Sequence, residues 1–204
     1  MSNTLDKVRK APHNKTFGVE IECFVPHRNA GIKIGSYYQM WFAGADGSLQ
    51  DPRPTRRAVE FVSQPLPFNG LNRQIDWLWK KTGGWEHNET CGVHVHVSAK
   101  QVSLKRVRQF ADKLGAISAE EFCILFGRRP NQYCRNAFDI YSRYRAINFT
   151  NAHTVEFRMF SGGDAAWVKE CVRRVRIMCH FRGPVTFDSL FEAFTKPEKV
   201  DPNA

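Results

Sequence analysis

Two short segments of the chain alternate apolar and polar residues, and their polar positions carry side chains that can bind a cation. One segment holds Glu20 and Glu22, and the other holds His94 and His96. Side chains at positions i and i+2 of a β-strand point to the same face and stand roughly 7 Å apart. Each pair should therefore share the polar face of a strand, while the valine and isoleucine residues beside them face the core.

A third alternating segment gives Glu156 and Arg158 the same relation, and Glu60, flanked by Val59 and Phe61, adds another carboxylate. A curved sheet could gather all these side chains on one concave surface. Carboxylates combined with an imidazole suit Mg²⁺ or Mn²⁺ that is bound by side chains and phosphate oxygens. Adjacent glutamates also repel each other unless a cation neutralises them.

The simpler interpretation of any one such segment is an amphipathic strand with a solvated polar face. The distribution of lysine argues against it for the three segments together. Lysine and arginine number 30 in the chain, yet residues 16–24, 91–98 and 154–160 contain no lysine. A solvated face in a basic protein should include lysine, whereas a metal-binding face should exclude it.

The elements that must position these residues can be read from the same periodicities. Helical spacing of apolar residues predicts helices at 68–81, at 103–126 and from 164 onward, with Arg173 on the outer face of the last one. Alternation predicts strands at 16–24, 36–43, 57–63, 91–98, 143–149 and 154–160. Strands joined by both turns and helices predict an α+β domain with a mixed or antiparallel sheet.

Composition predicts one domain at 16–195 in a chain of 204 residues. We expect residues 1–15 to be a flexible basic head, not a secretory signal, and residues 196–204 to be a flexible tail. No apolar run is long enough to span a membrane, which predicts no membrane partner. Six cysteines without a CxxC pair are typical of reduced thiols, so we expect a cytoplasmic protein.

The formal net charge of +10 indicates anionic partners, among them nucleotides, nucleic acid or acidic substrates. A basic surface that serves only solubility is an equally good interpretation of the charge alone. The sequence contains no P-loop, no G-x-G-x-x-G and no G-x-S-x-G, so it offers none of these local motifs for a phosphate or a nucleophile.

Five motifs together resemble those of the amidoligase family, a compact branch of the carboxylate–amine ligases related to glutamine synthetase and glutamate–cysteine ligase. The resemblance covers roughly residues 16–163. In chain order the motifs are GVEIE at 18–22, DGSL at 46–49, EFVSQP at 60–65, CGVHVHV at 91–97 and TVEFR at 154–158. Each motif alone is unspecific, but all five stand in the family's order. Members of this family are known largely from bacteria, fungi and phages, so the resemblance implies a bacterial or phage origin for this chain.

The resemblance implies a curved, largely antiparallel sheet of about six strands that forms a cradle, with helices on its other face. It also implies ATP bound at one end and metal along the concave surface. Glu20, His94 and Glu156 would hold the metal that bridges the ATP phosphates. Glu22 and Glu60 would hold a metal nearer the amino-acid site.

The remaining roles also follow from the resemblance. Arg158 would meet the transferred phosphoryl group, and Asp46 would contact metal or substrate. His96 would be a ligand or would contact the substrate carboxylate, so we count it with Arg158 and Glu60 among the candidate catalytic residues.

Arginine is concentrated in the segment 126–143, which lacks clear periodicity. Arg128, Arg129 and Arg135 are candidates to face ATP or substrate, although a solvated basic loop is the simpler interpretation.

The resemblance thus predicts an ATP-dependent carboxylate–amine ligase that uses Mg²⁺ or Mn²⁺ and an acyl-phosphate intermediate. Its substrates would be a small-molecule or peptide carboxylate and an amine. The alternative is an inactive member of the same fold that serves as a basic binding module for nucleic acid or a protein partner. A third interpretation is a zinc hydrolase that uses His94 and His96, but the sequence contains no motif such as HExxH to support it.

Overall fold

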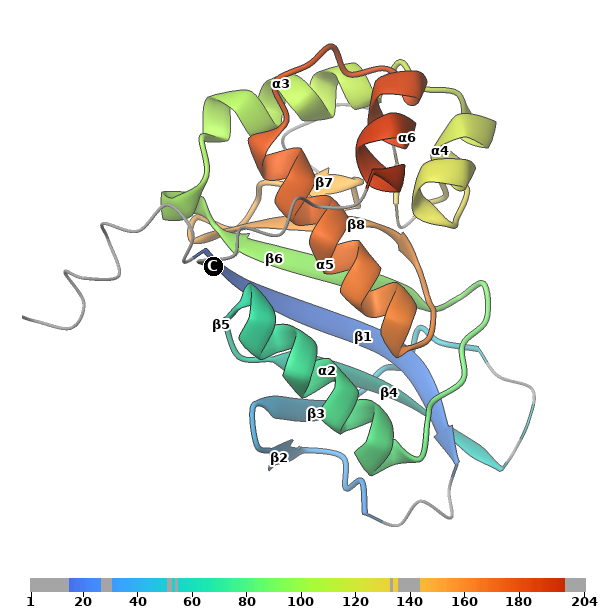
Figure 1. The fold of residues 1–204 in the computed structure, drawn as a ribbon. Helices are drawn as coiled ribbons and strands as arrows, with labels where there is room; N and C mark the ends of the chain where they lie inside the picture. The colour runs from blue at the N-terminus through green and yellow to red at the C-terminus, as the bar shows by residue number, and fades with distance from the viewer. Residues whose placement is uncertain are drawn as a thin grey trace, which may run out of the picture.

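The computed structural model describes residues 15–26, 31–50, 53, 55–132, 134–135 and 144–196. The expected head and tail lie almost entirely outside these residues, as does 136–143 of the arginine-rich segment. One sheet of eight strands forms the centre of the molecule (Figure 1). Its strands are β1 (Thr16–Pro26), β2 (Ser36–Tyr38), β3 (Trp41–Ala45), β4 (Arg56–Ser63), β5 (Leu66–Pro67), β6 (Gly92–Ser98), β7 (Ile147–Asn148) and β8 (Thr154–Ser161).

The strand order is β2-β3-β4-β1-β6-β8-β7, with β5 paired to the start of β1. Every pairing between these named strands is antiparallel. The predicted α+β class is therefore confirmed. The number of strands exceeds the expected six because the predicted strand at 36–43 is a hairpin of two, and because the two-residue β5 joins the sheet.

Helices pack against one face of the sheet. They are α2 (Phe68–Thr82), α3 (Leu104–Leu114), α4 (Ala119–Phe126), α5 (Ala165–His180) and α6 (Phe187–Thr195), with a short 3₁₀ turn at Ala99–Gln101. The two long helices, α2 and α5, lie along this face near β1 and β6 (Figure 1). None of the helices in the described part of the chain combines the length and the apolar character that a membrane crossing requires.

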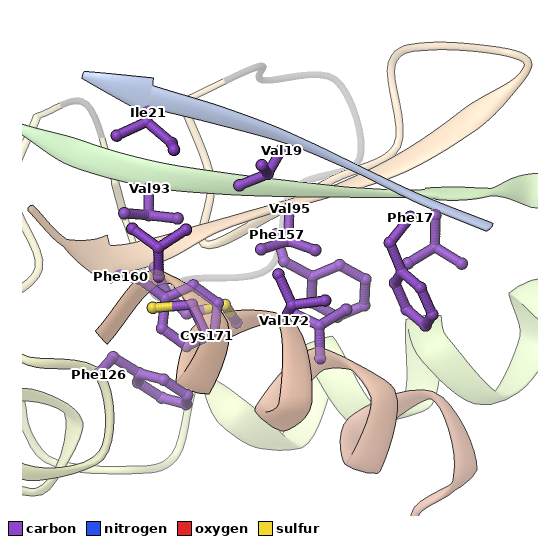
Figure 2. Packing of buried hydrophobic residues seen from close by; sticks show 14 of the residues in the cluster. Phe17, Val19, Ile21, Val93, Val95, Phe126, Phe157, Phe160, Cys171 and Val172 are labelled. Carbon is purple, nitrogen blue, oxygen red and sulfur yellow. The ribbon is translucent and has the colours of Figure 1, made fainter. Parts of the chain in front are cut away.

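The core lies between this helical layer and the apolar face of the central strands (Figure 2). Val19 and Ile21 of β1 and Val93 and Val95 of β6 are all at most 1% exposed. Helix α5 packs Cys171 and Val172 against them (Figure 2). Because side chains alternate along a strand, burial of this face turns the glutamates and histidines between these residues to the opposite face.

The predicted single helix at 103–126 is wrong, since the structure has two helices there. Helix α3 ends at Leu114 and is followed by Gly115. Ser118 then begins α4 with a capping box, in which its hydroxyl accepts from the Glu121 amide and the Glu121 carboxylate accepts from the Ser118 amide. A capping box is a strong start signal for a helix, so the chain turns here instead of continuing.

Arg173 does not lie on an outer face of α5 as predicted. It is half-buried and forms two hydrogen bonds to the Glu170 carboxylate, at 2.6 and 2.7 Å. A further hydrogen bond reaches the carbonyl oxygen of Phe194 in α6. Arg173 therefore ties α5 to α6, a role that helical periodicity alone does not reveal.

Candidate functional site

The register of the central strands brings the predicted site residues together on the polar face. Residues that lie directly opposite each other in an antiparallel pair point to the same side, with Cβ atoms about 5 Å apart. Glu22 of β1 lies opposite Glu60 of β4, and Glu20 of β1 lies opposite His94 of β6. On the other side of β6, His96 lies opposite Glu156 of β8.

A β-bulge in β8 lies beside Arg158 and lets two consecutive residues, Met159 and Phe160, both face the core. Opposite the two-residue step from Val93 to Val95, β8 advances three residues, from Phe160 to Phe157. The extra residue lets Phe157, Met159 and Phe160 all face the core, while Arg158 stays on the polar face that it shares with Glu156, partly exposed. Simple alternation would have required one of those side chains to point the other way.

The first group of possible metal ligands consists of Glu20, His94 and Glu156. Their ligand atoms all lie within 4.8 Å of one another. His94 Nδ1 lies 2.9 Å from Glu20 Oε2 and 3.5 Å from Glu156 Oε1. These are the three residues that the resemblance assigns to the metal beside the ATP phosphates.

The second group consists of Glu22, Glu60 and His94, again with ligand atoms within 4.8 Å of one another. His94 Nε2 lies 3.5 Å from Glu22 Oε1. The imidazole is only 3% exposed and stands between the two groups, with each ring nitrogen directed toward a different carboxylate. One side chain thus borders both candidate cation positions.

The carboxylates of the site interact strongly through their charges. Burial, followed by repulsion from Glu20 and other carboxylates, raises the pKa of Glu60 to about 7. Burial also opposes ionisation of Glu20, but hydrogen bonds from His94 and His96 outweigh it and hold the pKa of Glu20 well below its usual range. A buried cluster of this kind, rich in carboxylate oxygens and short of positive charge, fits a divalent cation.

His96 lies at the edge of the first group. Its Nε2 is 3.1 Å from Glu20 Oε1, and its side chain is 23% exposed. Burial lowers the pKa of His96, but the hydrogen bond and the charge of Glu20 more than compensate, so the pKa is raised. His96 therefore acts on the site through Glu20 and belongs to neither group of possible ligands.

Glu156 is held through both of its oxygens. Arg158 Nη1 donates to Oε1 at 2.6 Å, and Asn148 Nδ2 of β7 donates to Oε2 at 2.7 Å. Asn148 is 6% exposed, and its own oxygen accepts from the Thr150 amide at 2.9 Å. The sequence reasoning missed Asn148. The available signal was a polar residue inside the predicted strand at 143–149, next to buried Ile147.

A pocket of about 460 Å³ adjoins the carboxylates. Arg128, which lies just after α4, and Arg158 both line it, so the structure brings two of the four candidate arginines to one cavity. Arg128 Nη1 donates to the carbonyl oxygen of Phe160 at 3.4 Å. The lining residues are Glu22, Ser48, Gln50, Glu89, Thr90, His94, Arg128, Asn131, Gln132 and Arg158.

Gly92 leaves room for this arrangement. A Cβ atom at this position would lie 2.8 Å from Arg128 Nη1, 3.0 Å from Glu22 Oε2 and 3.3 Å from His94 Nε2. Any larger residue would therefore displace groups from both the pocket and the possible ligand set. Glycine is required here by the close approach of charged side chains, and not by an unusual backbone angle.

Three predicted site residues lie apart from these groups. Asp46 accepts hydrogen bonds from the amide and hydroxyl of Ser48, at 2.8 and 2.6 Å, and acts on the site by repelling Glu60. Arg129 is 68% exposed and pairs with Glu120 at 3.2 Å. Arg135 is exposed, and its backbone forms an isolated parallel β-bridge with the backbone at Arg145. Neither arginine lines the pocket.

The comparisons with known proteins give one family. Residues 28–139, just over half of the chain, match the model of a family described as "putative amidoligase enzyme". No match is found among the curated proteins.

The matched range includes Glu60, His94 and His96, but β1 and β8, with Glu20 and Glu156, lie outside it. The fold places both strands beside the matched part of the sheet, since β1 lies between β4 and β6 and β8 pairs with β6. The predicted family is confirmed, and three of the five motifs lie within the matched range. The chain belongs to this amidoligase family, whose name describes enzymes of the ligase type.

Proposed function

We propose that the protein is an ATP-dependent carboxylate–amine ligase that forms an amide through an acyl phosphate. One observation carries the proposal. Four carboxylates and one imidazole, drawn from β1, β4, β6 and β8, converge on one face of the sheet, beside a pocket lined by Arg128 and Arg158. Family membership supports a ligase in general, and this geometry supports the more specific reaction.

The residues present fit divalent metal. Glu20, His94 and Glu156 would hold one Mg²⁺ or Mn²⁺, and Glu22 with Glu60 would hold a second, because carboxylates with limited imidazole are the donors these ions prefer. When bound, the metal would offset the negative charge of the phosphate oxygens. Without metal, two histidines and one arginine are the groups that offset the negative charge of these four carboxylates.

The proposed reaction explains why phosphate chemistry and a carboxylate site occur together. A free carboxylate resists attack by an amine because the leaving group would be oxide. When a carboxylate oxygen of the substrate attacks the terminal phosphorus of ATP, ADP leaves and an acyl phosphate forms. The amine nitrogen then attacks the acyl carbon, phosphate leaves, the nitrogen loses a proton, and an amide remains.

The chain supplies fixed positive charge for the phosphoryl oxygens. Arg158 is oriented by its hydrogen bond to Glu156 and lines the pocket, so its remaining donors need little reorganisation to meet an anion. Arg128 lines the same pocket and its Nε atom is buried with no partner among the described residues. A buried donor without a partner is costly, which favours a bound anion at that position.

The test traces oxygen. A panel of carboxylates labelled with ¹⁸O is incubated with ATP and Mg²⁺, with hydroxylamine as a general amine. The expected result is a hydroxamate from at least one carboxylate, formed together with ADP and with phosphate that carries one ¹⁸O atom. Hydroxamate without label in the phosphate would contradict the acyl phosphate. A panel with no ADP formation at all would favour the inactive binding module.

A further inference from the structure

Two adjoining hollows lie on the helical layer, at the C-terminal end of α5. They measure about 310 and 390 Å³ and share the loop residues Phe181, Arg182 and Gly183. Helix α3 lies alongside this end of α5 (Figure 1). Together the hollows form what we call the basic groove, lined by Arg106, Gln109, Phe110, Lys113, Arg176, Ile177, His180, Phe181, Arg182, Gly183 and Val185. It shares no residue with the pocket of the carboxylate site.

The charge of the basic groove is of one sign. Its lining contains three arginines, one lysine and one histidine, and neither aspartate nor glutamate. Arg106, Lys113 and Arg182 are exposed, and no carboxylate of the described residues lies within ion-pair distance of them. Earlier along α5 the pattern is different, because Arg173 and Arg174 both pair with Glu170.

The groove is built on a packed framework. Phe181 meets the buried Phe110 of α3 edge to face, with ring centroids 6.2 Å apart. The Arg176 guanidinium lies 4.8 Å above the ring of Phe68. The loop after α5 is therefore anchored to α3 through Phe181, and the Arg176 guanidinium is held against Phe68 before any ligand arrives.

We propose that the basic groove binds a nucleic-acid strand through its phosphates. The cations are spread over two adjoining hollows, which suits a ligand with regularly repeated charges better than one free phosphate. Most of them are guanidinium groups, whose planar donors match phosphate oxygens. The net charge of +10 would also draw a polyanion toward the molecule. This inference is independent of the proposed ligase reaction, which uses the other face of the sheet.

The test measures binding of a labelled single-stranded oligonucleotide of mixed sequence, about 20 nucleotides long so that it exceeds one binding site. The double variant Arg106→Ala/Arg182→Ala is compared with Lys80→Ala/Lys81→Ala, which removes the same charge from exposed positions at the end of α2. We expect the groove variant to lose affinity about tenfold or more. Each lost phosphate contact should reduce the slope of log affinity against log salt by about 0.7.

Several outcomes would overturn the proposal. Absence of binding by the wild type at low salt is one, and equal loss in the two double variants is another, because it would show that only net charge matters. Polyglutamate that displaces the oligonucleotide as well as unlabelled oligonucleotide does would indicate an acidic protein partner instead. Thermal melting of each variant with ATP and Mg²⁺ checks folding and shows separately whether the carboxylate site is intact.

Discussion

Arg158 is both a partner of Glu156 and a wall of the pocket. Its Nη1 donates to the Glu156 carboxylate at 2.6 Å, and its side chain is 19% exposed. The guanidinium can hold this carboxylate with one donor and present others to an anion, whereas the ammonium of lysine is a single point of charge on a flexible stem. A lysine at this position would keep the positive charge but could not make both sets of contacts.

We therefore predict that Arg158→Lys retains the fold and most of the affinity for ATP but lowers turnover at least about a hundredfold, the effect typical of losing a donor matched to the transition state. The matched control is Arg73→Lys, at an exposed position of α2 on the far side of the sheet. Turnover and ATP-dependent melting are measured for both. Near-normal turnover of Arg158→Lys would show that this residue only positions Glu156.

Asn148 has a different role, because it touches Glu156 but does not line the pocket. Groups that orient a metal ligand typically change metal affinity by 10-fold to 100-fold when they are removed. Asn148→Ala should therefore weaken Mn²⁺ binding about tenfold, as measured by the paramagnetic signal of free Mn²⁺. The control is Asn151→Ala, which removes a turn hydrogen bond to the His153 amide outside the site. Equal affinity in both variants would exclude a positioning role.

Strand pairing, more than strand identity, builds the candidate site. The alternation in the sequence predicted that Glu20 and Glu22 share a face, and the structure places them so. It did not predict that Glu22 would stand opposite Glu60, because register depends on strand order and turn lengths far along the chain. The bulge that lets both Met159 and Phe160 face the core is likewise a property of the β6–β8 pair and not of either segment alone.

Helix ends and long-range polar contacts could not be predicted from the sequence, for related reasons. The apolar stripe of 103–126 continues across the break at Gly115, so periodicity joined two helices that a capping box at Ser118 separates. Asn148 carries no charge, and its importance depends on a partner in the neighbouring strand. The parts predicted correctly were those with a local cause, namely the alternating strands β1, β6 and β8, the buried stripe of α2 and the start of the last helix near residue 164.

Helix α5 contains an ion-pair cluster that makes part of the stability depend on pH. Burial disfavours ionised Glu170, but hydrogen bonds from Arg173 and Arg174 outweigh it, and the pKa of Glu170 is lowered. A lowered folded-state pKa means that the stabilisation is present above the unfolded pKa and is lost as the pH falls through the folded value. Arg173 and Arg174 also bond to backbone carbonyls in α6 and α4, so the cluster joins three helices.

Glu170→Gln should accordingly lower the free energy of unfolding by about 1 kcal/mol near pH 7, and the difference from wild type should shrink toward pH 3. Denaturant unfolding at both pH values measures it. Glu192→Gln serves as the control, since the Glu192–Lys196 pair on α6 is about two-thirds exposed and such pairs contribute little. A deficit in Glu170→Gln that persists unchanged at pH 3 would mean that packing, and not charge, accounts for the loss.

At the scale of the whole molecule, two clusters of opposite charge lie on different layers. The polar face of the sheet concentrates carboxylates around His94, whereas the helical layer ends in the basic groove. An anion such as ATP is attracted by the net charge of +10, yet the carboxylates at the candidate site repel it. ATP should therefore need a divalent cation in order to bind at the carboxylate site, but not in order to bind in the basic groove.

Our last prediction uses that difference. With Mg²⁺ present, ATP at about one hundred times its Kd should stabilise the folded state by about 2.7 kcal/mol, which for a chain of this size raises the Tm by about 5–10 °C. With a chelator the increase should nearly vanish, because the uncompensated carboxylates then oppose the phosphates. Glu156→Ala should lose the Mg²⁺-dependent increase, and Arg106→Ala/Arg182→Ala should keep it. Equal stabilisation with and without chelator, abolished only by the groove variant, would place the nucleotide on the basic groove and refute ATP binding at the carboxylate site.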